Sequence, residues 1–316
     1  MGFGLSNRPR RYTLGMRLAL VAVLLASSGF AGIVEDVRTA IDKGDLAGTD
    51  RLVQAYRQAH GADSELAAAI SWQARGALAA KKFDRATAYA EQTRQMALPN
   101  LRGPRVGRER WLYAMGASIE VQAQVMAAQG ETAEAVAFLR TELKTYTGTS
   151  QQERIQKNIN LLSLEGKPAP ELDSAVWFGP KPPTIASLRG KAILLFFWAH
   201  WCPDCKADVP IIAGLMKKYG PRGLALIGPT EYYGYVAEGA DAPPAVEKPY
   251  IESIRRQFYA PLGDFSAPLS NANFARYGAS STPTLALVDR KGIVSWYHPG
   301  AATEQELSVQ IEKALR

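Results

Sequence analysis

The sequence predicts an all-α domain followed by an α/β domain, and three observations lead to this expectation. Residues 32–163 are rich in Ala, Gln, Arg and Glu, poor in Pro, and carry apolar residues at helical spacing. Residues 192–198 form a wholly apolar run that suits a buried strand. A helical stretch over 204–219 and a second apolar strand over 224–227 follow. This order implies parallel pairing with a right-handed crossover, so the α/β domain is expected over 164–316.

Three segments of the helical domain read alike. Residues 43–46, 82–86 and 130–135 each precede aromatic or aliphatic residues at helical spacing. Each looks like the turn and second helix of a tetratricopeptide-type hairpin, although the copies do not follow that repeat's period of about 34 residues. Stacked hairpins form a groove that often docks a partner. The alternative is a helical bundle that only packs against the second domain. Residues 97–105 are expected to be a loop between hairpins.

In the first 31 residues, basic, apolar and small residues follow one another in the order that is typical of a secretory signal peptide. Four arginines precede the apolar stretch 18–25, and small residues follow, with Gly29 and Ala31 suited to the positions before a cut. The apolar stretch is shorter than the about 20 residues that a membrane span needs. We therefore expect a signal peptide over 1–31 and a periplasmic or otherwise exported chain. The alternative is an uncleaved anchor that holds the protein to the membrane, facing the periplasm.

The charge of the chain gives no sign of a nucleic-acid partner. The sequence has 37 basic and 30 acidic residues, a net charge of +7. Four of the basic residues and no acidic residue lie in 1–31, so the chain without this segment carries +3. The remaining charges are mixed along the chain and form no basic stripe of the kind that nucleic-acid binding requires.

The chain has two cysteines, Cys202 and Cys205, and both lie between the first predicted strand and the first helix of the α/β domain. This placement indicates a redox-active pair that alternates between dithiol and disulfide. A helix that starts at Cys202 turns its unpaired N–H groups and positive dipole end toward the sulfur, which favours the thiolate. We expect Cys202 to be the exposed, nucleophilic sulfur. Cys205, one turn on, can attack a mixed disulfide formed by Cys202.

Other uses of the cysteine pair fit the sequence less well. A zinc site needs four ligands, and the three histidines show no paired ligand spacing. Covalent haem attachment needs His directly after Cys205, where Lys206 stands. A purely structural disulfide would close too short a loop to restrain much of the unfolded chain. We therefore expect neither a metal nor a cofactor.

Several motifs together resemble the thioredoxin fold. The segments that carry this resemblance are Trp201–Lys206 after an aromatic strand, Pro210, and Ser281–Thr284 before an apolar strand. Residues 166–170 and 188–191 are similar to the TlpA/ResA branch, exported thiol-disulfide oxidoreductases related to the redoxin and AhpC-TSA group. The resemblance covers roughly the last half of the chain.

The resemblance implies roles for three residues that bind substrate. Pro283 is expected in the cis form against the disulfide, where it offers no N–H and leaves the sulfurs approachable. The backbone of Thr282 is expected to pair with an extended client peptide by strand addition. Trp201 is expected to shield the sulfurs. For Thr282 and Pro283, the alternative is an ordinary Thr-Pro pair before a strand.

The acidic residues around the motif set the expected direction of reaction. Thioredoxins carry a buried Asp, which assists deprotonation of the second cysteine, where this chain has Phe196. For Cys205 that role therefore lies elsewhere or is absent. Asp208 matches a Glu that ResA-like members keep, and it is our candidate proton acceptor; the alternative is a solvated acid at the start of a helix. Asp204 places negative charge near Cys202 and offsets part of the helix-end effect. This favours a reductant over a strong oxidant.

Residues 228–246 form a loop that the fold does not require. The loop contains Glu231, Tyr232, Tyr233 and Tyr235, and tyrosines offer broad contact surface with a polar end. Because long loops beside sites are often functional, we hypothesise that this loop borders the substrate groove. The alternative is a surface elaboration.

The sequence thus predicts an exported thiol-disulfide oxidoreductase, favouring a reductase, whose partners are protein thiols and disulfides and an upstream electron donor. One alternative is a peroxidase of the AhpC-TSA type. Its cysteine needs a Pro and a Thr or Ser at two preceding positions, but Leu195 and Ala199 occupy them. The other alternative is a non-catalytic protein whose helical domain recruits a partner.

Overall fold

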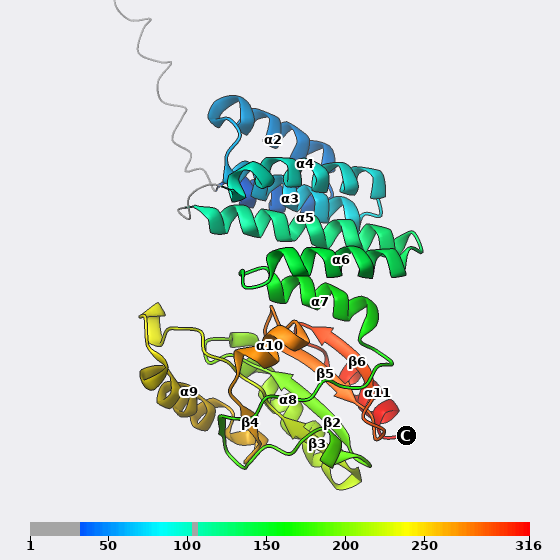
Figure 1. The fold of residues 1–316 in the computed structure, drawn as a ribbon, viewed down its shortest axis with the longest axis vertical. Coiled ribbons are helices and arrows are strands. Elements are labelled where there is room, and N and C mark those ends of the chain that lie inside the picture. Colours follow the sequence, from blue (N-terminus) through cyan, green and yellow to red (C-terminus); the bar gives the residue numbers. More distant parts are fainter. Residues whose placement is uncertain (1–31, 103–106) are drawn as a thin grey trace, which may run out of the picture.

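The computed structural model describes residues 32–102 and 107–316, so the expected signal peptide over 1–31 lies outside the described residues. Two parts follow one another along the chain and stack along the long axis of the molecule (Figure 1). The first part is helical, as predicted, and its helices are α1 (Ile33–Asp42), α2 (Leu46–His60), α3 (Ser64–Ala79), α4 (Phe83–Leu101), α5 (Arg108–Ala128), α6 (Thr132–Tyr146) and α7 (Gln152–Ser163).

Consecutive helices of the first part pack side by side as hairpins. Two of the helices begin at aspartate caps: the Asp45 side chain accepts a hydrogen bond from the Gly48 N–H at 2.7 Å, and Asp63 accepts one from Leu66 at 2.8 Å. Alanines fill the contact between α3, α4 and α5, where Ala77 and Ala90 are fully buried. Small side chains let neighbouring helices approach closely, which is the role expected for them in the hairpin pattern.

The predicted loop over 97–105 is wrong in its first half. Helix α4 continues to Leu101 with Pro99 inside it, and only residues 103–105 of the predicted loop lie outside the described residues. Proline removes the N–H that would bond to the carbonyl of Gln95. Because Gln95 is exposed, water can satisfy that carbonyl, while fully buried Ala97 keeps the last turn packed on the core.

The second part is built on a four-stranded sheet with strand order β3-β2-β5-β6. Strands β2 and β3 are parallel, as predicted, and β5 is antiparallel to both β2 and β6. A separate antiparallel pair joins β1 to β4. The strands are β1 (Trp177–Phe178), β2 (Ala192–Phe197), β3 (Leu224–Ile227), β4 (Ala267–Pro268), β5 (Thr284–Val288) and β6 (Val294–Pro299). The helices are η1 (Ala186–Leu188), α8 (Pro203–Tyr219), η2 (Gly220–Arg222), η3 (Ala237–Gly239), α9 (Pro244–Phe258), η4 (Ala260–Leu262), α10 (Asn271–Tyr277) and α11 (Glu304–Ala314).

Strand β2 is apolar throughout because both faces of the sheet are covered. Leu194 and Phe196 belong to the core beneath α8 and α11, whereas Leu195 and Phe197 face α10. One helix boundary supports the sequence prediction, since α8 closely matches the expected 204–219. Helix α11 begins after Thr303, whose hydroxyl accepts a hydrogen bond from the Glu306 N–H. Within the described ranges, no helix has the length and apolar character needed to cross a membrane.

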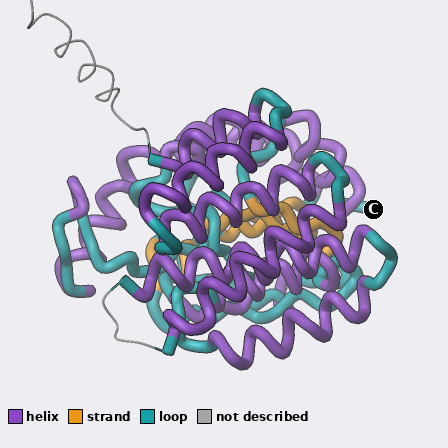
Figure 2. Tube along the Cα trace, turned by 90° about the horizontal axis from the view of Figure 1, so that it is seen from above, coloured by secondary structure: helices purple, strands orange, loops and turns teal. Residues whose placement is uncertain are grey.

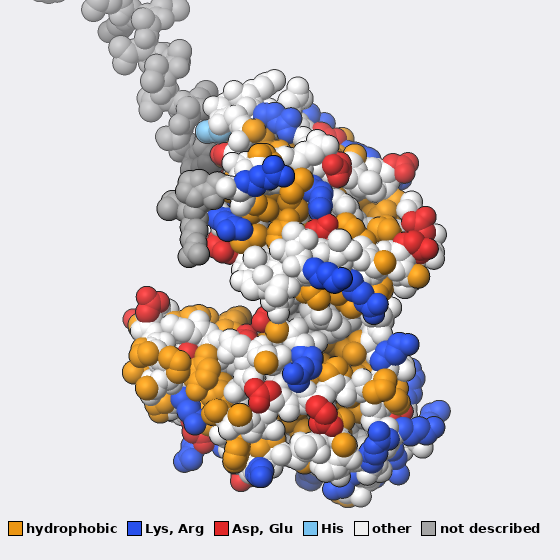
Figure 3. Space-filling view, viewed as in Figure 1, with side chains coloured by type: hydrophobic (Ala, Val, Ile, Leu, Met, Phe, Trp, Pro, Cys, Tyr) orange, Lys and Arg blue, Asp and Glu red, His pale blue; other side chains and the backbone are white. Residues whose placement is uncertain are grey.

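The two parts touch through α7, which lies against α10. The Asn160 side-chain amide donates a hydrogen bond to the Tyr277 carbonyl at 2.8 Å. Gly278 adopts φ +61°, and a Cβ there would overlap the backbone nitrogen of Lys157. Seen from the helical end, the helices of the first part lie over the strands of the second (Figure 2). The space-filling view shows a notch between the two parts at the left (Figure 3).

Substitution of Gly278 tests this contact between the two parts. Gly44→Ala is the matched control because Gly44 also has positive φ, +74°, with nothing within 4 Å of an added Cβ. The control should lose only the cost of a left-handed alanine, about 1–2 kcal/mol. Gly278→Ala should lose about 1–3 kcal/mol more, since the methyl group presses on the α7 backbone. Urea denaturation measures both losses, and equal losses would show that Gly278 is not pressed against α7.

Candidate functional site

The two cysteines form a disulfide at the start of α8, as the predicted redox pair requires. Cys202 is the N-cap of α8, and its sulfur accepts a hydrogen bond from the Cys205 N–H at 3.0 Å. Strand β2 ends at Phe197, so the cysteine pair lies beyond the carboxyl end of a central strand. When the pair is reduced, this N–H and the helix dipole stabilise a thiolate on Cys202.

The expectation that Cys202 is exposed is wrong for this oxidised form. Cys202 is 1% exposed and Cys205 is fully buried, whereas the neighbouring Trp201 is 44% exposed. Both sulfurs belong to the core cluster that also holds Trp198 and Tyr259. A reactant could therefore reach Cys202 only after a neighbouring side chain or loop has moved.

The loop before β5 lies directly against the first sulfur. The Thr282–Pro283 peptide bond is cis, as expected from the resemblance, and the Thr282 carbonyl oxygen lies 3.4 Å from the Cys202 Sγ. The sheet register explains the contact, since Phe197 of β2 pairs with Thr284 of β5. The residues that follow β2 and those that precede β5 therefore meet at the same edge. The Thr282 hydroxyl is buried and has no hydrogen-bond partner among the described residues.

Asp208 is buried, so the alternative of a solvated acid is wrong. It is 4% exposed, and its Oδ2 has no hydrogen-bond partner among the described residues. Burial, with a smaller contribution from Asp204, raises the pKa of Asp208 to about 6. Asp208 follows Cys205 by one turn of α8, which places both residues on one face of the helix. A carboxyl with this pKa can exchange a proton near neutral pH.

Sequence reasoning missed the surroundings of His200. Its ring is buried, and the rings of Tyr233, Tyr235 and Tyr250 surround it with centroid distances of 5.3–5.4 Å. His200 Nε2 lies 3.6 Å from Glu247 Oε1, which is too long for a hydrogen bond. Burial lowers the pKa of His200, although Glu247 opposes the shift. His200 is therefore neutral near pH 7 and adds no charge beside Cys202.

The loop over 228–246 lies against the motif. Buried Glu247 accepts hydrogen bonds from the N–H groups of Tyr233, at 2.6 Å, and Gly234, at 2.9 Å, which fixes this part of the loop. The Tyr233 ring then meets the Trp201 ring edge-on at 5.6 Å. No signal within the loop indicates its anchor, because Glu247 lies in the next helix, α9. That the loop contacts a bound substrate stays a prediction.

Two further carboxyl groups lie in or near this loop: Glu231 is buried and Glu153 is half-buried. Burial, followed by the nearby charges of Glu153 and Glu247, raises the pKa of Glu231 to about 9. Burial raises the pKa of Glu153, on α7 of the helical part, to about 7. The sequence indicates Glu231 only as a member of the loop, because its burial depends on elements that are distant in sequence.

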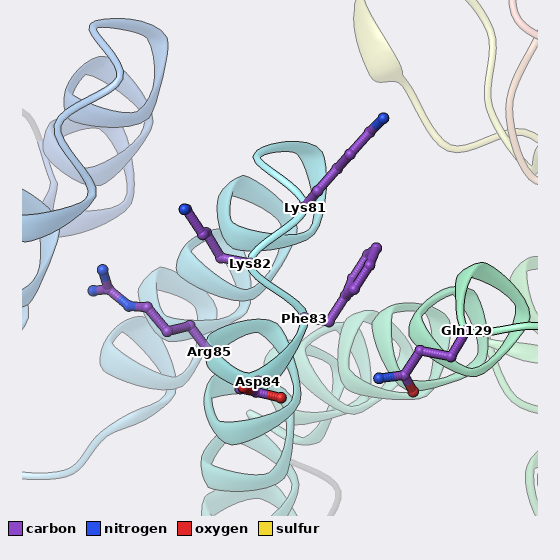
Figure 4. A pocket seen from close by; sticks show the side chains of 6 residues that line it. All are labelled: Lys81, Lys82, Phe83, Asp84, Arg85 and Gln129. Atoms are coloured by element: carbon purple, nitrogen blue, oxygen red, sulfur yellow. The ribbon is translucent and has the colours of Figure 1, made fainter.

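A hollow of about 310 Å³ lies at the turn between α3 and α4, away from the sulfurs (Figure 4). Its lining belongs wholly to the helical part, and the labelled side chains point in different directions around the turn. It is therefore separate from the cysteine site. The lining residues are Lys81, Lys82, Phe83, Asp84, Arg85 and Gln129.

Comparison with known proteins matches residues 164–311 to the Redoxin family model. Thioredoxin-like protein YneN of Bacillus subtilis is 27% identical over 173 residues, which cover 53% of this chain and 89% of YneN. Thiol:disulfide interchange protein DsbE of Xylella fastidiosa is 27% identical over 144 residues, 45% of this chain and 65% of DsbE. A crystal structure of a thiol:disulfide interchange protein from Chlorobium tepidum is 23% identical, with a TM-score of 0.36, and the match covers 48% of this chain and 97% of that one.

We expect the Glu231 carboxyl to make the free energy of unfolding decrease as pH rises. Its pKa is about 4.3 in the unfolded chain and about 9 in the folded one. Between these values the folded protein holds a proton that the unfolded chain has lost, so unfolding becomes more favourable by up to about 1.4 kcal/mol per pH unit. We expect Glu231→Gln to flatten this decline between about pH 7.5 and 9.

Glu153→Gln is the comparison for this measurement. Because the charge of Glu153 helps to raise the pKa of Glu231, its loss should move the decline toward lower pH but not remove it. Urea denaturation of the three proteins across this pH range gives the slopes. A wild-type slope that Glu231→Gln does not reduce would contradict the assignment.

Proposed function

We propose that this protein is an exported reductase of client protein disulfides, because residues 164–311 match the Redoxin family model and hold a disulfide in the Cys-x-x-Cys motif. The oxidoreductase type rests on the domain and on its relatives. The exported location, the reductive direction and the client are the proposed elements. The chain spans 65% of DsbE of Xylella fastidiosa, so the activity of the whole protein is part of the proposal.

The observation that carries the proposal is the juxtaposition of the disulfide and the Thr282 backbone. The Cys202 sulfur is capped by the α8 N-terminus on one side and lies 3.4 Å from the Thr282 carbonyl oxygen on the other. An extended peptide that pairs with the Thr282 backbone would bring its own sulfur next to Cys202. Trp201, exposed at the rim beside Tyr233, would cover the opposite side of such a peptide.

The reaction then proceeds in two exchanges. The Cys202 thiolate attacks one sulfur of the client disulfide, and the other client sulfur leaves as a thiolate. The Cys205 thiolate next attacks the Cys202 sulfur and releases the second client sulfur as a thiolate. The client gains two electrons, and the pair is oxidised to the disulfide seen in the structure. A dithiol electron donor must then reduce Cys202 and Cys205 again.

Asp208 is proposed to accept the proton of Cys205. Its buried carboxyl, with a pKa of about 6, is ionised at pH 7 but close enough to that pH to take up a proton. Phe196 is fully buried in strand β2, where the related fold carries an acid, so Asp208 is the acid that this chain offers on the face of Cys205.

Two observations support the reductive direction. Asp204 stands between the cysteines in the first turn of α8, where its negative charge opposes the thiolate on Cys202. A less stabilised thiolate favours the disulfide form and therefore a reductant. His200 is buried and neutral, so it does not counteract this effect. For the peroxidase alternative, the buried positions of Leu195 and Ala199 carry no group that could assist a peroxidatic cysteine.

Capture of the mixed disulfide tests the assignment of the two cysteines. Cys205→Ser should trap clients on Cys202, because no resolving thiol remains to release them. Cys202→Ser is the matched control and should trap none, although it retains one thiol. Non-reducing gel electrophoresis followed by mass spectrometry identifies the adducts. Equal adduct yields from the two variants would contradict the roles of Cys202 as the attacking thiol and Cys205 as the resolving thiol.

The role of Asp208 is tested by the pH dependence of client release. We expect the rate of the second exchange to fall as pH drops through about 6, because protonated Asp208 cannot take the Cys205 proton. Asp208→Asn should slow this step about a hundredfold at pH 7 and remove that limb of the profile. Asp204→Asn, one turn earlier, is the control and should keep the limb. Stopped-flow quenching of Trp201 fluorescence follows the step, and an unchanged profile in Asp208→Asn would exclude the role.

A further inference from the structure

A second hollow, of about 390 Å³, opens where the helical part faces the loop that carries Pro283. Its walls come from α3, α5, α7 and the turn before α7 on one side, and from Ser280 and Ser281 on the other. Neither part of the chain forms this hollow alone. The lining residues are Trp72, Arg75, Tyr113, Glu120, Ser150, Gln151, Arg154, Lys157, Ser280 and Ser281.

The lining carries three cations and one carboxylate. Arg154 Nε donates to Glu120 Oε2 at 2.6 Å, and Lys157 Nζ lies 3.6 Å from the same oxygen. Burial alone would raise the pKa of Glu120, but Arg154 and Lys157 hold it at about 2, so this carboxylate is charged. It balances one of the three positive charges. Two positive charges of the lining remain to attract an incoming group.

Arg75 is the lining cation that forms no ion pair within the described residues, although the charge of Glu120 acts on it. Its guanidinium stacks on the Trp72 ring at 4.6 Å and lies 5.6 Å from the Tyr113 ring. Its Nη1 is buried and makes no hydrogen bond within the described residues. Burial, and then the charge of Arg154, lowers the pKa of Arg75. A buried donor without an acceptor costs free energy, and a carboxylate could receive two hydrogen bonds from such a guanidinium.

The position of the hollow indicates what would occupy it. Ser281 directly precedes Thr282, whose carbonyl is 3.4 Å from the Cys202 sulfur. Neighbouring residues are about 3.8 Å apart, so an extended client bound along Thr282 would reach the hollow within about two to four residues. Ser280 and Ser281 are exposed, and they leave this route open.

We propose that this hollow binds an acidic side chain, Asp or Glu, of the client polypeptide, two to four residues from the cysteine that is exchanged. The inference rests on the proposed function and adds a preference for acidic clients. The helical part then acts as the specificity element of the reductase. Arg75 and Lys157 supply the charge, and Arg75 is held in place by its contact with Trp72.

Matched disulfide peptides test the preference. One peptide carries Glu at the second to fourth positions from its cysteine, and the other carries Gln there. The full chain, reduced beforehand, should show a kcat/KM about tenfold higher for the Glu peptide, mainly through KM, because charge complementarity acts on encounter and binding. The preference should vanish in about 1 M salt, where the screening length is about 3 Å.

Variants locate the charge that is responsible. Arg75→Gln and Lys157→Gln should each reduce the ratio of kcat/KM between the Glu and Gln peptides. Arg57→Gln, which changes an exposed arginine on α2 outside the lining, is the control and should keep that ratio. Circular dichroism and urea denaturation show whether the variants are folded.

The outcomes separate this inference from the proposed function. Equal kcat/KM values for the two peptides would overturn the inference and leave the reductase intact. A preference that persists in both Arg75→Gln and Lys157→Gln would also overturn it, since the charge would then lie elsewhere. If the wild-type protein reduces neither peptide, the proposed function itself fails.

Discussion

The structure depends on one juxtaposition, in which the Cys202 sulfur meets the N-terminus of α8 and the backbone of Thr282 at the same place. Strand β2 must end where α8 begins, and β5 must run antiparallel beside β2. Their register pairs Phe197 with Thr284, which brings the loop before β5 against the cysteine pair. The apolar faces that hold these strands in register are therefore also what positions the chemistry.

Several ionisable groups around the cysteine motif and its neighbouring loop are buried. Asp208, Glu231 and His200 are all buried, and in each case burial is the largest cause of the pKa shift. Burial favours the neutral form of a group, so the acids hold protons longer and the histidine loses its proton earlier. Of these groups, Asp208, with a pKa of about 6, can exchange a proton near neutral pH, whereas Glu231, with a pKa of about 9, stays protonated there. This setting suits thiol chemistry, in which a proton must move with each exchange.

The helical part makes specific contacts with the part that holds the cysteines. Helix α7 touches the segment after α10 at Gly278 and holds Tyr277 by a hydrogen bond from Asn160. That contact fixes the distance between the cations of the helical part and the loop around Ser281. A client that extends past the sulfurs would meet both parts, which gives a physical reason for joining a helical module to this fold. The specificity would then depend on the rigidity of one helix contact.

The sequence by itself determined the features that depend on neighbours along the chain. The apolar run before Cys202 specified a central strand, the spacing of Cys202 and Cys205 specified a redox pair at a helix start, and the Thr-Pro pair specified the adjacent loop. Only the tertiary structure decided which groups are buried. It buries Cys202, and it buries Asp208, which is therefore not a solvated acid. It also joined Arg75 to a loop some two hundred residues away. Burial and charge pairing are set by contacts between distant segments, and no local pattern encodes them.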